Sequence, residues 1–284
     1  MKSDFELAQA FARSLKHLPA MPAIAQRALA MLGRPDTTTQ QLAELIAHDP
    51  SITARVLRYA NAPYFGARRQ IRDLVSAIVV LGYTAATEIV SAASLVDWYG
   101  KDEDVQAQAS WRRSLKIAAL ASRLARRIYA GHGASETFIA GLMHDIGRST
   151  LRTTRSMLAP IGASSRRAED AYWISQLGFS SCDLGAALVH SWNLAEEVEI
   201  TARYCEAHAP FATVRGECAV VLALVMTAIV LTDGESFTDE EALGAFAVRL
   251  HNNPVGEPLR RAFLATRREA RTLPRLATST AMSS

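Results

Sequence analysis

The stretch FIAGLMHDIGRSTL, residues 138–151, decides how the rest of the chain is interpreted. It places a histidine and an aspartate, His144 and Asp145, side by side within a largely apolar segment. A neighbouring imidazole and carboxylate can both bind one divalent cation, which polarises a phosphoryl group and activates a bound water. The question is therefore whether this pair belongs to a working metal site or to the remnant of one.

Metal-dependent phosphohydrolases of the HD type bind a divalent cation with such an adjacent His–Asp pair, a further histidine from an earlier helix and an aspartate from a later one. The further ligands are needed because two ligands alone hold a catalytic cation poorly. The chain has no histidine between His48 and His132. Arg113, in the sequence SWRRSL, stands where that ligand is expected. His132 lies between two glycines, and we expect it in an exposed loop rather than at a metal.

The closing aspartate of such a site is also missing from its expected place. No aspartate occurs between Asp183 and Asp233, and the apolar helix that should supply one has Met226 and Thr227 in its interior. We therefore expect no bound metal, no cofactor, no catalytic residue and no enzymatic activity.

Arg113 suggests what replaces the cation. A guanidinium carries a permanent positive charge and a rigid fork of donors, so it can satisfy a buried carboxylate. We expect Arg113 to pair with Asp145 in a vestigial pocket formed by Arg113, His144 and Asp145. The alternative, in which Arg113 points to solvent beside Arg112, stays open.

Bulk properties favour a globular cytoplasmic protein. Of the 284 residues, 49% are hydrophobic and 21% are charged, and the net charge of +3 does not by itself imply a nucleic-acid partner. Three cysteines without a C-x-x-C pattern predict reduced thiols rather than a disulfide framework or a thiolate zinc site. The longest apolar run, residues 219–231, is shorter than the roughly 20 residues of a membrane span, so we expect a buried core helix.

Helical periodicity dominates, and no alternating strand pattern is present, so the sequence predicts an all-α fold. Threonines precede a helix in residues 37–49, and Asp49 is expected to cap the helix that begins at Pro50. The alternative for His48 and Asp49, a second acidic site, is the weaker interpretation. Further helices are expected at 71–99 (two, meeting near Gly82), 107–130, 134–147, 183–191, 194–207 and 219–231, and two more follow towards residue 284.

Several motifs in order resemble the HDOD domain, the HD-related output domain of bacterial signalling proteins. They are LPAMP, ELIAHDPSITARVLRYAN and YFG within residues 17–66, AIVVLG at 77–82, and then WRRSL, FIAGLMHDIG and LGAALVHSWNL. The resemblance covers roughly residues 17–210. It implies an HD-like helical domain preceded by an N-terminal helical bundle, with regulatory rather than defined catalytic roles.

Within that resemblance, the chain departs from the metal-competent pattern. Ser181 stands where many members carry histidine, and His208 is kept while Ala207 replaces a commonly paired histidine. The GYP signature of the HD-GYP phosphodiesterases is absent. Ser181 and His208 are thus expected only as neighbours of the vestigial pocket.

We therefore expect three parts: an N-terminal bundle over 1–100, a degenerate HD-like subdomain over 101–215, and C-terminal helices with a basic tail over 216–284. The predicted function is non-catalytic signal transduction through contacts with signalling proteins, without membrane or nucleic acid. A small-molecule ligand and a homodimer stay open. The alternatives are a metal-dependent phosphohydrolase or phosphodiesterase, and a nucleic-acid-binding regulator acting through the six arginines of residues 259–284.

Overall fold

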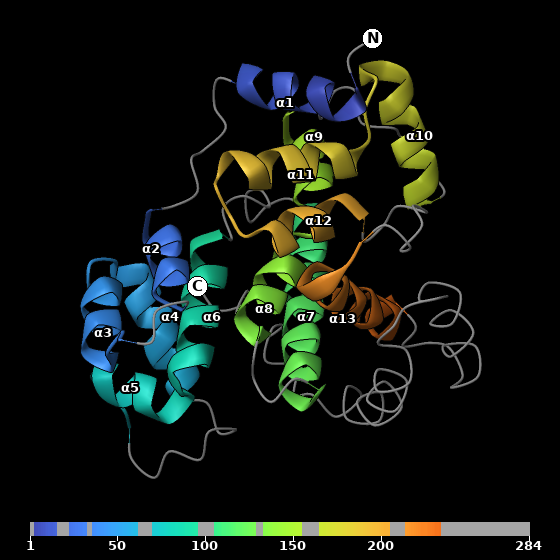
Figure 1. Cartoon of the computed structure of the whole chain (residues 1–284). Coiled ribbons are helices and arrows are strands. Elements are labelled where there is room, and N and C mark those ends of the chain that lie inside the picture. The colour runs from blue at the N-terminus through green and yellow to red at the C-terminus, as the bar shows by residue number, and fades with distance from the viewer. Residues whose placement is uncertain are drawn as a thin grey trace. The chain divides into compact units, whose positions relative to one another are not determined.

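Capping residues begin two helices where the sequence places them in the computed structural model of the chain (Figure 1). The side chain of Thr38 accepts a hydrogen bond from the first turn of α3 (Thr39–Ala47). Asp49 accepts two backbone hydrogen bonds at the start of α4 (Pro50–Ala60). The prediction that Asp49 is a helix cap is confirmed.

The structure describes residues 3–15, 23–32, 36–61, 70–95, 105–128, 133–154, 165–204 and 214–233. Within these residues the chain forms thirteen α-helices and no strand, which confirms the all-α prediction. The two helices expected after residue 233, and the loop around His132, lie outside the described residues. The chain separates into two compact units, Pro19–Trp98 and the remainder.

The unit Pro19–Trp98 contains five helices packed around aliphatic side chains. They are α2 (Ala23–Leu32), α3, α4, α5 (Leu74–Leu81) and α6 (Tyr83–Leu95). Leu42, Ile46 and Val56 are fully buried in this core. Gly82 separates α5 from α6 with φ of +81°, a conformation that favours glycine, as expected from the break in periodicity there.

Asn61 ends α4 through hydrogen bonds of its side chain and not through a left-handed backbone conformation. Its φ is −89°, and its side chain holds the chain together across a loop. The amide Nδ2 donates to the carbonyl oxygens of Leu57 (2.8 Å) and Ile71 (2.9 Å), and Oδ1 accepts from the Ile71 N–H (2.8 Å). One side chain therefore closes the connection between α4 and α5.

Replacing Asn61 by alanine is expected to lower the free energy of unfolding by about 1–2 kcal/mol, because the half-buried backbone groups of Ile71 lose their partners. Urea unfolding followed by circular dichroism measures the change. The exposed Gln70→Ala is the control and should cost less than about 0.5 kcal/mol. Equal effects of the two substitutions would refute this role.

The second unit holds the remaining eight helices. They are α1 (Asp4–Ser14), α7 (Val105–Ile128), α8 (Ala134–Met143), α9 (Ile146–Thr154), α10 (Arg166–Leu177), α11 (Ser181–Ser191), α12 (Glu196–Tyr204) and α13 (Gly216–Asp233). Helix α13 packs against α7, α8 and α12, and its side chains from Val221 to Leu231 are buried. The prediction of a buried core helix at 219–231 is confirmed.

By length and composition alone, α13 and the bent pair of α5 and α6 could each cross a membrane. For α13, however, 67% of the apolar window is buried against the protein, as in the core helix of a globular unit.

Helix α1 differs from the expected arrangement, in which residues 1–100 form one bundle. It belongs to the second unit, where it packs against α11. The reason is chemical: Ala8 and Ala12 give α1 a small apolar stripe that fits closely against another helix, and both are buried there.

Candidate functional site

His144 and Asp145 lie in the turn between two helices, not within one continuous helix as expected. Helix α8 ends at Met143, and α9 begins at Ile146. Both side chains are nevertheless buried, with exposed fractions of 3% and 4%. Helix α8 begins after Gly133, which has a left-handed conformation and provides no side-chain cap.

Glycine contacts hold this turn deep in the unit. A Cβ atom on Gly147 would lie 2.0 Å from the carbonyl oxygen of Ser181 and 2.4 Å from the backbone nitrogen of Gly185. A Cβ on Gly141 would lie 2.7 Å from the Cα of Ala118. The backbone of residues 141–147 is therefore wedged between α7 and α11, and only glycine permits this approach.

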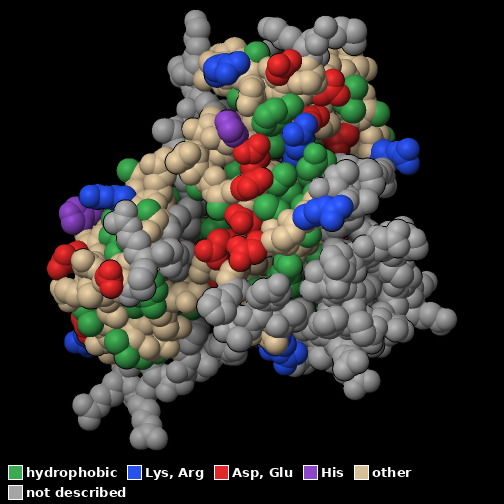
Figure 2. Space-filling model, viewed as in Figure 1, with side chains coloured by type: hydrophobic (Ala, Val, Ile, Leu, Met, Phe, Trp, Pro, Cys, Tyr) green, Lys and Arg blue, Asp and Glu red, His purple; other side chains and the backbone are tan. Residues whose placement is uncertain are grey.

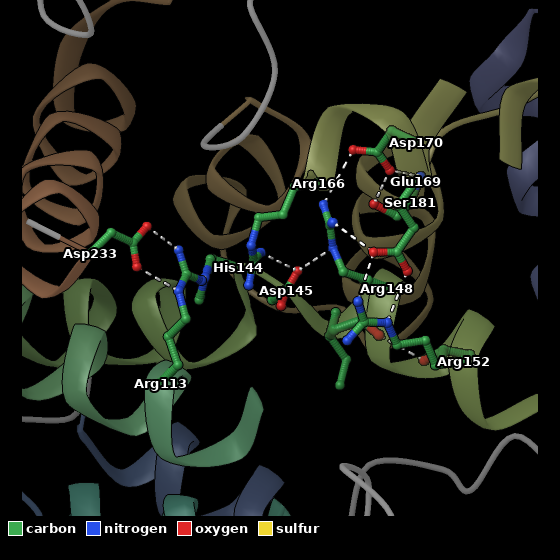
Figure 3. Close-up of polar contacts among 12 residues, drawn as sticks. Arg113, His144, Asp145, Arg148, Arg152, Arg166, Glu169, Asp170, Ser181 and Asp233 are labelled. Atoms are coloured by element: carbon green, nitrogen blue, oxygen red, sulfur yellow. Dashed lines mark hydrogen bonds and ion pairs between the residues drawn. The ribbon is translucent and has the colours of Figure 1, made fainter. Parts of the chain in front are cut away.

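Arg113 reaches into the site from α7 and contacts two groups at once (Figure 3). Its Nη1 lies 2.8 Å from Nε2 of His144, while Nε and Nη2 donate to the two carboxylate oxygens of Asp233 at 2.9 Å and 2.8 Å. Asp233 is the last residue of α13. The guanidinium thus lies between an imidazole and a carboxylate, where a cation shared by these two groups would lie.

The contacts of His144 fix its protonation state. Its Nδ1 lies 2.7 Å from the carbonyl oxygen of Gly141, which can only accept, so Nδ1 carries the proton. A guanidinium can only donate, so Nε2 uses its lone pair to accept from Arg113. His144 is therefore neutral, and the nitrogen that a metal would need is already engaged.

The structure differs from the expected hydrogen-bonded pair between Arg113 and Asp145. Asp145 instead accepts through Oδ1 from Nε of Arg148 at 3.0 Å and from Nη1 of Arg166 at 3.1 Å. Arg113 pairs with Asp233, because the end of α13 brings that carboxylate to α7. The hydrogen-bonded carboxylate partner of Arg113 is therefore Asp233, while the charge of Arg113 still helps to lower the pKa of Asp145.

Arg148 is the centre of a second, deeper set of contacts. Its side chain is 1% exposed and forms ion pairs with Asp145, with Oε2 of Glu169 at 3.2 Å and with Oδ2 of Asp170 at 3.2 Å. Arg152 adds two hydrogen bonds to Glu169, at 2.8 Å and 2.7 Å. The network joins the turn, α9 and α10 (Figure 3).

Ser181 lies at the edge of this network, as a neighbour of the pocket. Its hydroxyl and its backbone N–H both donate to Oδ1 of Asp170, which links α11 to Arg148. The side chain is buried and engaged, so it acts as a structural donor. His208, the other expected neighbour, lies outside the described residues.

The charges of the site balance. Its cations are Arg113, Arg148, Arg152 and Arg166, and its anions are Asp145, Glu169, Asp170 and Asp233. Burial by itself raises the pKa of the Asp145 carboxyl, but the charges of Arg166 and Arg148 outweigh burial and hold that pKa well below its ordinary value. The pKa of the Glu169 carboxyl is also lowered: burial raises this pKa, but the hydrogen bond from Arg152 and the charge of Arg148 lower it by more. Both carboxylates are charged at neutral pH.

This donor set does not fit a divalent cation. The Nε2 lone pair of His144, both oxygens of Asp233 and the carboxylate of Asp145 are bound to guanidinium groups. Among the residues that the structure describes, no three His, Cys, Asp or Glu side chains converge as a metal site would require. A metal ion would have to displace arginines that are held by several contacts each.

The lowered carboxyl pKa values predict sensitivity to acid. A group whose pKa is lower in the folded state stabilises the fold above its unfolded pKa, and this stabilisation is lost as the pH falls through the folded value. The free energy of unfolding should therefore be nearly constant above about pH 5 and should fall below about pH 4, while the arginines stay charged. Urea titrations between these limits measure it.

The control for this prediction is Asp145→Asn, which removes the group with the strongly lowered pKa. The variant is less stable at neutral pH, but its stability should depend less steeply on acid. Parallel pH profiles for the two proteins would contradict the assignment.

Reasoning from sequence missed most of the network. The helix carrying Arg166, Glu169 and Asp170 was not expected, and Asp233 was set aside because only the interior of the apolar helix was considered. Arg148 lies within the stretch FIAGLMHDIGRSTL, three residues after Asp145. That spacing favours a contact on one side of a helix and was the available signal.

Two further histidines have structural partners. His48 ends α3, and its Nδ1 lies 2.6 Å from the carbonyl oxygen of Glu44, which leaves no second acidic site there. His190 pairs with Glu199 at 2.9 Å. Tyr64 and Phe65 lie outside the described residues.

An all-α fold with a buried, adjacent His–Asp pair and glycine-packed helices defines an HD-like helical domain, in which Arg113 contacts His144 and Asp233. The chain belongs to the HDOD family: the family model of the HDOD domain matches residues 18–208. The resemblance found in the motifs is confirmed.

Solved structures share this fold. An HDOD domain protein of unknown function from Geobacter sulfurreducens is 24% identical, with a TM-score of 0.72 over 95% of this chain and 96% of that one. A "putative phosphohydrolase" from Shewanella amazonensis SB2B is 19% identical, with a TM-score of 0.69 over 93% and 96% of the two chains. A "putative signal transduction protein" from Marinobacter aquaeolei VT8 is 16% identical, with a TM-score of 0.61 over 94% and 66%.

An uncharacterized protein of Treponema pallidum (strain Nichols) is 21% identical over 203 residues, which are 70% of this chain. The match spans only 39% of that relative's length. These comparisons establish the family and the fold of the chain.

Proposed function

We propose that the protein is a non-catalytic regulatory module that acts through contacts with other proteins in the cytoplasm. One observation carries this proposal: the guanidinium of Arg113 binds both His144 and Asp233 in the place that a cation would take. The pocket is thereby filled by the chain itself.

Phosphohydrolase chemistry of the HD type needs a metal ion to polarise the phosphoryl group and to lower the pKa of the attacking water. A guanidinium supplies charge but has no free coordination position for water. The neighbouring carboxylates are poor general bases here, because the pKa values of Asp145 and Glu169 are lowered by arginines. The same contacts make the network a rigid support for the helices around it.

The alternative of a nucleic-acid-binding regulator gains no support from the face in Figure 2. Acidic side chains gather there over α12, which contributes Glu196, Glu197 and Glu199. A phosphate backbone is repelled by such a face. The arginines of residues 259–284 lie outside the described residues.

Metal binding by an Arg113→His variant tests the proposal. The purified wild-type chain should hold no stoichiometric manganese, iron or zinc, and should not hydrolyse bis(p-nitrophenyl) phosphate. Arg113→His releases Nε2 of His144 and the carboxylate of Asp233 and adds an imidazole, so its affinity for Zn²⁺ should rise by about tenfold or more. Calorimetric titration measures the affinity.

Arg112→His is the matched control, since it adds the same imidazole one position away, where the native arginine contacts Gln108 instead. Its Zn²⁺ affinity should equal that of the wild type. Stoichiometric metal in the wild-type chain, lost together with phosphodiester turnover in His144→Ala, would overturn the proposal.

A further inference from the structure

Within the second unit, helix α1 packs on a surface formed by α11, α12, Gly178 and Phe179, which we call the α1 groove. Two aromatic side chains of α1 anchor it there. The ring of Phe5 meets that of His190 edge-on at 6.4 Å, and the ring of Phe11 lies 5.3 Å from that of Phe179. His190 is near the end of α11, and Phe179 precedes its start, so the two aromatic rings of α1 contact both ends of α11.

The groove is shaped for these side chains. The guanidinium of Arg203, from α12, lies 4.7 Å above the Phe5 ring, a cation–π contact. At the other end, a Cβ atom on Gly178 would lie 3.1 Å from Cδ1 of Leu7, and the φ of +81° at Gly178 also favours glycine. Between these ends, Ala8 and Ala12 are small enough for α1 to approach α11 closely.

The side chains of α1 are only partly buried by this packing. Its only fully buried residues are Ala8 and Ala12, whereas Phe5, Leu7 and Phe11 are half-buried. An isolated helix of this length is marginal in water, so α1 is helical because it is docked. If it leaves, the groove exposes an apolar stripe around Phe179, which another helix must cover.

We propose that this groove, defined by α11, α12, Gly178 and Phe179, is the protein-binding site of the molecule, and that α1 is its displaceable internal occupant. The ligand is an amphipathic helix of a partner protein that carries the pattern of α1, Phe-x-Leu-Ala-x-x-Phe-Ala at residues 5–12. Binding follows the helix-in-groove mode, in which a few apolar anchors on one helical face supply most of the affinity.

This inference names the class of partner for the proposed regulatory role and rests on that role. Its test concerns the groove alone, whereas metal content and turnover concern catalysis. The peptide-binding prediction can therefore fail while the non-catalytic role holds, and the reverse is also possible.

The experiment uses a fluorescein-labelled peptide of residues 1–15 and the full-length chain. Phe5→Ala/Phe11→Ala removes both anchors from α1 and leaves the groove intact. This variant should bind the peptide about tenfold or more tightly than the wild type, in which α1 competes. Fluorescence anisotropy measures both affinities.

Two controls make the result specific. Arg13→Ala changes an exposed residue of α1, so this chain should bind the peptide as weakly as the wild type. A peptide in which both phenylalanines are replaced by alanine should not bind the loosened variant. Adding Arg203→Met to that variant should weaken binding of the native peptide, because the contact above Phe5 is lost.

Circular dichroism shows whether the loosened variant is folded; if it is not, Ala8→Asp serves in its place, because a charge in that buried position also expels α1. Failure of a folded, loosened variant to bind the native peptide, or equal binding of both peptides, would overturn the inference. A wild-type dimer that the peptide dissociates would overturn the assignment to a separate partner and give the groove to a second copy of the chain.

Discussion

Replacing Arg148 by methionine is expected to lower the free energy of unfolding of the second unit by about 3–5 kcal/mol. The side chain is 1% exposed and is the shared partner of three carboxylates, those of Asp145, Glu169 and Asp170. Methionine keeps an unbranched apolar stem and removes the charge and the donors of the guanidinium. The loss is large because three carboxylates lose their shared buried donor at once, which leaves Asp145 with Arg166 and Glu169 with Arg152 as their remaining cations.

Urea unfolding at neutral pH, followed by circular dichroism, measures this loss. Arg152→Met is the matched control: Arg152 lies on the same helix and also binds Glu169, but its side chain is 31% exposed. That substitution should cost about 1 kcal/mol, because water replaces much of the lost contact. The difference between the two variants isolates the effect of burial.

A double variant separates charge from packing. In Arg148→Met/Asp145→Asn one of the carboxylates that lost Arg148 is neutral, so the double variant should be more stable than the sum of the single changes predicts. A loss below about 1 kcal/mol for Arg148→Met, or strict additivity in the cycle, would show that the network does not stabilise the fold.

Gly147→Ala is expected to cost about 3 kcal/mol or more, because its Cβ would overlap backbone atoms that cannot rotate away. That atom would lie 2.0 Å from the carbonyl oxygen of Ser181, so α9 and α11 would have to separate. Separation would also move Ser181 from Asp170 and so disturb the arginine network. Thermal and urea unfolding both report the loss.

The facing glycine provides a matched control. A Cβ on Gly185 would lie 3.4 Å from the backbone nitrogen of Gly147 and 3.7 Å from Cβ of Ala202, which are ordinary contacts. Because alanine favours the helix by about 1 kcal/mol relative to glycine, Gly185→Ala should be nearly neutral. Similar losses in the two variants would show that the close approach at Gly147 is not what limits the packing of α9 on α11.

Local features of the sequence determined much of the fold. The caps Thr38 and Asp49, Pro50 in a first helical turn, and the break at Gly82 act within a few residues of their own position. Such short-range hydrogen bonds and backbone preferences are encoded where they act. The apolar run ending at Leu231 likewise predicted its own burial, because so many apolar side chains are unfavourable in water.

The sequence alone also predicted His144, Asp145 and Arg113 as one site, and Arg113 does contact His144 in the structure. It did not give the partners. The assignment of Arg113 to Asp233, 120 residues away, depends on how α13 packs against α7. The assignment of Asp145 to Arg148 and Arg166 depends on the turn after α8 and on a helix with no strong periodicity.

The physical reason for this division is the range of the interactions. Caps and helical periodicity follow from the chemistry of neighbouring residues, so the order of residues contains them. A buried charge, in contrast, must be paired, but any of several opposite charges can pair with it, and chain distance does not select among them. The sequence therefore determined which helices form and which groups need a partner, and only the packing of the helices decided which partner each group received.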